Sequence, residues 1–258
     1  ALTSNQVLSN TASGNGGAGI DIRNAVKTLI QANLIENNKG VAGIYPSGGA
    51  SQNALKQNIV RLNQGVGIRN NGPTTLNNSW SGNSLYGNLA GGILLSSGGN
   101  LNLAAPQLLN VVNNVVTGNA TAGATVELFS DNNRQGQFFE QRTTAGADGS
   151  FTFTLAPNGQ GANLTAITID PQGNGSPFSS PISRQGQLLP TDTPTPPTPE
   201  ETPTATPTPL TPVPTTGTPT PTATATATAT ATTTVIPTGT PVSGESQPNK
   251  LYLPIVRR

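Results

Sequence analysis

The chain has 258 residues and a formal net charge of +1, and only 9% of its residues are charged and 4% aromatic. It contains no Cys, His or Met, which excludes disulfides, thiolate and imidazole catalysis, and zinc sites built from His and Cys. The small net charge argues against nucleic-acid binding, and no run of about 18 apolar residues could span a membrane. We therefore expect no cofactor, no nucleic-acid partner and no membrane span. Because Met is absent, we also expect that Ala1 is not the encoded start.

The first hundred residues contain an internal repeat. The pattern Asn-x-apolar-x-x-Asn occurs as NQVLSN at 5–10, NLIENN at 33–38, NIVRLN at 58–63 and NSLYGN at 83–88. A Gly-Ile step follows each copy, at 19–20, 43–44, 67–68 and 92–93. The last three Asn segments are 25 and 25 residues apart and the Gly-Ile steps 24, 24 and 25, so two independent markers keep one period.

This period predicts a stacked coil of short strands, because no apolar segment within it is long enough for a helix. Equivalent residues of stacked strands lie about 4.8 Å apart, and an Asn amide both donates and accepts, so a column of Asn can bond along the stack. Asn and Gly also tolerate the left-handed backbone of sharp corners. The expected Asn ladder contains Asn33, Asn58 and Asn83 together with Asn38, Asn63 and Asn88. The expected inward residues are Ile20, Ile22, Ile35, Ile44, Val60, Ile68, Leu85 and Ile93.

The repeat with its Asn and Gly-Ile markers resembles the right-handed parallel β-helix repeats of the pectate-lyase-like superfamily, found in many bacterial surface proteins. The resemblance covers residues 1–103 and implies about four coils of an N-terminally incomplete domain. Lyases, hydrolases, adhesins and inert stalks share this fold, so the resemblance leaves the function open.

Residues 104–183 follow a different pattern. Pro106 cannot donate to a strand ladder, and short alternating segments separated by turns such as Asp148-Gly149 then predict an all-β sandwich. The stretch from VTGNATAGATVELFSD to NLTAITIDPQGNGSPFS resembles the small immunoglobulin-like modules of secreted bacterial β-helix proteins. The resemblance implies that Val126, Leu128, Phe151, Phe153 and Ile167 face the core. We expect this module to cap the open end of the β-helix, whose strand ladder would otherwise be exposed.

Residues 184–248 are dominated by Thr and Pro and have no apolar period, so they predict a disordered, semi-rigid spacer. Thr/Pro tracts are also typical of O-glycosylated stalks. The chain ends at 249–258 with NKLYLPIVRR, which resembles the endings of exported proteins of certain filamentous, often thermophilic, phototrophic bacteria. The resemblance implies a sorting, anchoring or docking peptide formed by Leu251, Tyr252, Leu253, Pro254, Ile255, Val256, Arg257 and Arg258.

Candidate site residues in the β-helix are few. Asp21 and Arg23 lie two apart on one strand and hence on one face, where a solvated ion pair is favoured over a lyase-like pair. Residues 1–103 carry six basic and two acidic side chains, a net of +4 that suits an acidic glycan or an anionic surface. The candidate binding residues are Trp80, Tyr86, Arg61 and Arg69. The two aromatic rings either stack on sugars or cover apolar surface at a coil junction.

The segment DNNRQG at 131–136 is similar to a calcium-binding loop. It departs from that pattern at Gln135, and Arg142 stands where the closing Glu is needed. A hairpin turn is therefore favoured, and we expect no metal site.

Together these features predict an all-β, non-enzymatic protein, exported to the surface of a bacterium, with a structural or adhesive role. The expected partners are other copies of the chain, in an extracellular fibre or sheath, or surface glycans. The alternative is a carbohydrate-active enzyme or glycan-binding module whose active coils lie upstream of Ala1.

Overall fold

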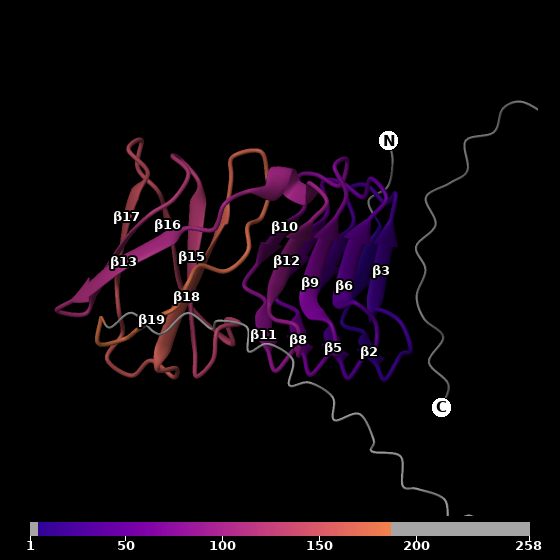
Figure 1. Cartoon of the computed structure of the whole chain (residues 1–258), viewed down its shortest axis with the longest axis horizontal. Coiled ribbons are helices and arrows are strands. Elements are labelled where there is room, and N and C mark those ends of the chain that lie inside the picture. The colour runs from indigo at the N-terminus through magenta and orange to yellow at the C-terminus, as the bar shows by residue number, and fades with distance from the viewer. Residues whose placement is uncertain (1–4, 187–258) are drawn as a thin grey trace, which may run out of the picture. The chain divides into compact units, whose positions relative to one another are not determined.

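A computed structural model describes residues 5–186 of the chain (Figure 1). These residues form an all-β structure with a parallel β-helix followed by an Ig-like sandwich, as predicted, and one short 3-10 turn, Gly99–Asn102, lies between them. The Thr/Pro-rich linker beyond residue 186 and the C-terminal peptide at 249–258 lie outside the described residues.

The β-helix has four coils, each contributing one strand to each of three parallel sheets (Figure 1). The first sheet contains β1 (Gln6–Leu8), β4 (Leu29–Gln31), β7 (Ala54–Lys56) and β10 (Ser79–Ser81). The second sheet contains β2 (Thr11–Ser13), β5 (Leu34–Glu36), β8 (Ile59–Arg61) and β11 (Ser84–Tyr86). The third sheet contains β3 (Ile20–Arg23), β6 (Ala42–Ser47), β9 (Val66–Asn71) and β12 (Ile93–Ser96). Equivalent residues pair in register, as Ile35 does with Val60 and Val60 with Leu85.

The interior of the β-helix is a stack of aliphatic side chains. Seven of the eight expected inward residues are at most 1% exposed, and Ile93 in the last coil is partly buried against the same cluster. Because the strands alternate, each contributes every second side chain to this core. The core therefore has the period of the sequence repeat.

Each corner before the first column of Asn is made by one residue in the left-handed conformation. This column contains Ser9, Ala32, Gln57 and Gly82, with φ between 52° and 60°. The left-handed backbone costs a non-Gly residue about 1–2 kcal/mol. Only the fourth coil places Gly here, so the other three coils carry strain that the stacking offsets.

We predict that Ala32→Gly raises the free energy of unfolding by about 0.5–1 kcal/mol. The relief of left-handed strain exceeds the entropy that Gly loses on folding. Chemical denaturation measures the change, and Ala54→Gly is the matched control. Ala54 is the first residue of β7 and is not among the residues with positive φ, so its replacement should cost about 0.5–1 kcal/mol. Equal losses in the two variants would contradict the assignment of strain to the corner.

The sandwich contains two antiparallel sheets. One contains β13 (Gln107–Val112), β14 (Val115–Asn119) and β17 (Ser150–Thr154). The other contains β15 (Thr125–Asp131), β16 (Phe138–Thr144), β18 (Asn163–Ile169) and β19 (Ile182–Ser183). Val126, Leu128, Phe151 and Phe153 lie in the core between these sheets.

Arg184, which was expected to open the linker, is anchored to the sandwich. Its backbone N–H donates to the carbonyl oxygen of Ala162, and its side chain donates to the carbonyl oxygen of Gly161 and pairs with Glu140. The second domain thus includes Arg184.

Candidate functional site

Two continuous ladders of Asn side chains run along the β-helix, and they are buried from the second coil onward. They contain Asn10, Asn33, Asn58 and Asn83, and Asn15, Asn38, Asn63 and Asn88. In Asn33, the backbone N–H and Nδ2 donate to Oδ1 of Asn58 at 3.0 and 2.9 Å, and Nδ2 also donates to the carbonyl oxygen of Val7 at 2.8 Å. The side chain of each inner Asn therefore satisfies a backbone N–H and a backbone carbonyl of the preceding coil and donates to the Asn side chain of the next coil. Such pairing is essential where water is excluded.

The first copy of the sequence repeat belongs to a different corner from the other three. Asn10 donates to Asn33, so it corresponds to the first Asn of the segment at 33–38 and not to the last. The carbonyl oxygen of Asn5 accepts a bond from the N–H of Leu29, which places Asn5 one corner earlier in the coil. The copy at 5–10, which begins 28 residues before the copy at 33–38 and so departs from the period of 25, was thus assigned to the wrong corner.

A third ladder was missed by the sequence analysis. It contains Thr28, Asn53, Asn78 and Asn100, joined from backbone N–H to side-chain oxygen at 2.8, 3.1 and 3.2 Å. The segments NALKQN at 53–58 and NSWSGN at 78–83 fit the same Asn pattern and were the available signal.

The second ladder continues into the Ig-like domain. The backbone N–H and Nδ2 of Asn88 donate to Oε1 of Gln135 at 3.0 and 3.2 Å, and Nε2 of Gln135 donates to the carbonyl oxygen of Asn88 at 2.8 Å. Gln135 thus occupies the position that an Asn would have in a fifth coil.

Phe178 likewise replaces an aliphatic residue of a fifth coil. A Cβ on Gly67 would lie 2.8 Å from the side chain of Leu85 in the next coil, and a Cβ on Gly92 would lie 2.9 Å from the ring of Phe178. The core of the β-helix is therefore continuous with the second domain. Phe129 and Ile167 belong to the same cluster, which corrects the expectation that Ile167 faces the centre of the sandwich.

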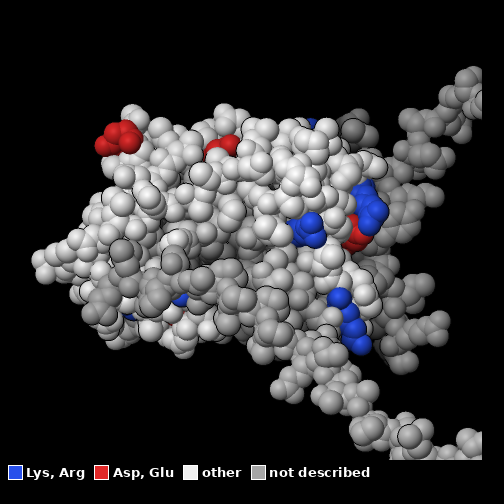
Figure 2. All heavy atoms as spheres, viewed as in Figure 1, with Lys and Arg blue, Asp and Glu red and all other residues white. Residues whose placement is uncertain are grey.

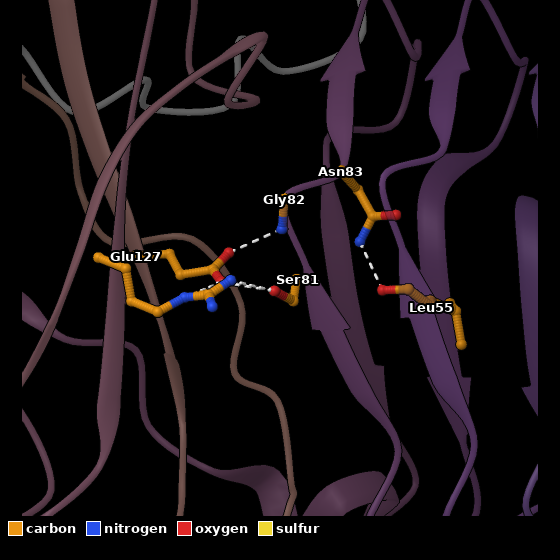
Figure 3. Close-up of polar contacts among 6 residues, drawn as sticks. Leu55, Ser81, Gly82, Asn83 and Glu127 are labelled. Carbon is orange, nitrogen blue, oxygen red and sulfur yellow. Dashed lines mark hydrogen bonds and ion pairs between the residues drawn. The ribbon is translucent and has the colours of Figure 1, made fainter. Parts of the chain in front are cut away.

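Glu127 on β15 connects the Ig-like domain to the end of β10 and to the corner residue that follows it (Figure 3). Its side chain is fully buried, and its carboxylate accepts bonds from Oγ of Ser81 at 2.6 Å and the N–H of Gly82 at 2.8 Å. Nε of Arg142 on the neighbouring strand also donates to this carboxylate at 2.9 Å. A buried carboxylate that lost these donors would be strongly destabilising.

Trp80 lies at this junction and not on an outer face. It is 1% exposed, its Nε1 donates to the carbonyl oxygen of Ser176 at 2.9 Å, and a Cβ on Gly175 would lie 2.5 Å from its ring. The expectation that it could stack on a sugar is therefore corrected. The sequence had left open that this ring covers a coil junction, and that is its position.

Arg61 and Tyr86 lie together on the outer face of the second sheet, in register with Glu36. Nε of Arg61 donates to Glu36 at 2.7 Å and its NH1 donates to the Tyr86 hydroxyl at 2.9 Å. The bonds to Tyr86 and then Glu36 raise the pKa of Arg61. This column links three successive coils, so its charge is already paired.

Arg69 lies on a different face, the outer side of the third sheet. Its guanidinium is 5.8 Å from the centre of the Tyr45 ring, and its Nε donates to Ser96 at 3.1 Å. On an earlier strand of this sheet, Nε of Arg23 pairs with Asp21 at 3.0 Å, in a largely exposed ion pair. Figure 2 shows that basic and acidic side chains adjoin over this part of the β-helix and do not gather into a single-sign patch.

The loop at 131–136 is a turn organised by its own carboxylate. Asp131 is 1% exposed and accepts bonds from the N–H groups of Asn133, Gln135 and Gly136 at 2.6–2.8 Å. Donors thus surround the carboxylate and hold Gln135 under the ladder. Among residues 5–186, no group of three acidic side chains gathers at one point, and no helix is long and apolar enough to cross a bilayer.

Two family comparisons match the chain. The family described as "Right handed beta helix region" matches residues 2–138, and "Bacterial Ig domain" matches residues 104–182. The two matches overlap at residues 104–138, where the chain passes from the coils to the antiparallel strands of the sandwich. No curated protein matches the chain.

Proposed function

Because this chain belongs to the right-handed β-helix family and carries a bacterial Ig domain, we propose that it is a structural or adhesive protein exported to a bacterial cell surface. Both domain types are consistent with a surface-associated protein. The mechanism is mechanical: a rigid stack of coils holds an outer surface at a distance from the cell. We propose no reaction for the chain.

The observation that carries this proposal is the end cap formed by Gln135, Phe178 and Glu127. Gln135 extends an Asn ladder, Phe178 extends the core and Glu127 binds the corner of the β-helix, so together they cover part of the interior surface of the last coil. A capped solenoid suits a chain exposed to proteases and to other proteins, since an open end would offer a ladder for strand addition. The polar side chains of the outer faces bond to one another along the stack, as in the column of Glu36, Arg61 and Tyr86.

The cap also bears on assembly. It covers the C-terminal end of the coils through side-chain and loop contacts. Within residues 5–186 no strand pairs with the outer edges of the last-coil strands β10, β11 and β12 or of the first-coil strands β1, β2 and β3. Head-to-tail stacking of identical coils is therefore blocked at one end. A fibre or sheath would have to form through other contacts, and electron microscopy of natively isolated protein distinguishes fibres from single particles.

The experiment that tests the surface role is immunolabelling of intact, unpermeabilised cells with antibodies against residues 5–186. We expect surface label that external protease removes, with an antibody to a cytosolic protein as the control. The same purified protein, incubated with acidic and neutral polysaccharides, should release no new reducing ends. Release of sugar fragments would support the alternative of a carbohydrate-active enzyme, and label seen only after permeabilisation would contradict the surface role.

A further inference from the structure

The junction between the domains contains an open cavity of about 320 Å³. It is lined by Lys56, Gln57, Ser81, Gly82, Phe139 and Arg142. Four of these residues come from the third and fourth coils of the β-helix and two from β16 of the Ig-like domain. The cavity thus exists only where the two domains meet, and none of the outer-face residues discussed above lines it.

The cavity arises from a change of side-chain size between successive coils. Lys56 pairs in register with Ser81, and the corner residue Gln57 is followed in the next coil by Gly82. Small residues therefore form the floor, which is held against the buried carboxylate of Glu127 (Figure 3). The layer of Ser81 and Gly82 separates two walls, one formed by Lys56 and Gln57 and the other by Phe139 and Arg142. Because strands stack about 4.8 Å apart, these walls are roughly two strand spacings apart, which is enough for one sugar ring.

The walls present hydrogen-bond donors and an aromatic ring. Lys56 is exposed, and no partner is found for its ammonium group within residues 5–186. Gln57 accepts a bond at Oε1 from Gln31, which turns the acceptor away and leaves its amide N–H groups to donate. Arg142 is anchored through Nε and NH2 to Glu127, with 53% of its side chain exposed. Phe139 is 45% exposed and packs edge-on against Phe129.

We propose that this cavity binds an anionic sugar residue, carboxylated or sulfated, of a surface or matrix glycan. The acid group pairs with Lys56 and Arg142, because two cations and one buried carboxylate leave the site with a net positive charge. The sugar hydroxyls accept from the Gln57 amide, and the apolar face of the ring lies on Phe139. An acidic protein side chain would use the cations and leave the aromatic ring exposed, so a sugar fits more of the site.

The test is isothermal titration of the full chain with three oligosaccharides of similar length. These are an oligogalacturonate, a chondroitin sulfate fragment and uncharged maltohexaose. We expect binding of at least one anionic oligosaccharide, weakening with salt as an exposed charge pair does, and none of maltohexaose. The two anionic probes distinguish carboxylate from sulfate as the preferred group. Absence of binding for both would overturn the proposal.

Two variants locate the site. Lys56→Gln and Phe139→Leu should each weaken binding about tenfold, and Leu keeps the apolar contact with Phe129 while removing the ring. Lys39→Gln is the matched control, since Lys39 is also exposed but lies in another coil and outside the cavity. Unfolding midpoints equal to the parent show that each variant is folded. Equal losses in the Lys39 variant, or equal affinity for a polyglutamate peptide, would overturn the sugar site without bearing on the structural role proposed above.

Discussion

Asn58→Ala is expected to lower the free energy of unfolding by about 3–5 kcal/mol. The amide of Asn58 accepts bonds from the backbone N–H and Nδ2 of Asn33 and donates to the carbonyl oxygen of Ile30, at 2.9–3.0 Å. Its removal takes the partner from the backbone N–H of Asn33, from one N–H of the Asn33 amide and from the carbonyl oxygen of Ile30, each costing about 1–3 kcal/mol, although local relaxation recovers part of this. Chemical denaturation followed by circular dichroism measures the loss.

The matched control for this prediction is Asn10→Ala. Asn10 stands in the same ladder but in the first coil, where its side chain is exposed and donates to Oδ1 of Asn33 at 3.2 Å and to the carbonyl oxygen of Leu8 at 3.0 Å. We expect a cost below about 1 kcal/mol, because water replaces those bonds. Similar losses in the two variants would mean that Asn stabilises the fold through its backbone preference at the corners and not through buried hydrogen bonds.

Glu127→Ala is expected to cost about 3–5 kcal/mol and to loosen the junction between the domains. The change leaves the N–H of Gly82 and the hydroxyl of Ser81 without their acceptor, each costing about 1–3 kcal/mol, and it removes the partner of the half-exposed Arg142. The chain contains a single Trp, and Trp80 is buried at this junction. A red shift of its emission that is complete at a lower denaturant concentration than in the parent protein is the expected readout.

Two comparisons make this second prediction specific. Glu36→Ala also removes an Arg–Glu pair, but that pair lies on an outer face and is partly exposed, so we expect a loss of about 1 kcal/mol or less and unchanged Trp emission. Adding Arg142→Ala to Glu127→Ala should cost little more than Glu127→Ala alone, because the half-exposed guanidinium has by then already lost its partner. An additive double variant would show that Glu127 acts through packing alone.

The repeat sequence contained enough information to predict the coils. Asn and Gly-Ile markers at one period define stacked strands, because every coil repeats the same corner and the same inward aliphatic residues. The third ladder was missed because Thr28 replaces Asn in the second coil and breaks the pattern there. The copy at 5–10 was misassigned because three corners share nearly the same local sequence.

The junction could not be predicted from the sequence in the same way. Gln135 and Ser176 contact the last coil across 47 and 96 residues, and neither belongs to a repeat. Gln135 continues a column of Asn and Phe178 continues a column of aliphatic residues. No sequence pattern around either residue indicates this role. Trp80 was assigned to a binding face for the same reason: its partners lie in another domain.

The account depends on one claim, that the Ig-like domain replaces a fifth coil so that both domains form one cooperative unit. Native-state hydrogen exchange of the full chain, resolved by mass spectrometry, tests this claim most directly. The account predicts that amides of β10 and β11 in the last coil open with the same free energy as those of β15 and β18, and that Glu127→Ala lowers all of them together. Rapid exchange of the last coil while the Ig-like strands stay protected would contradict it.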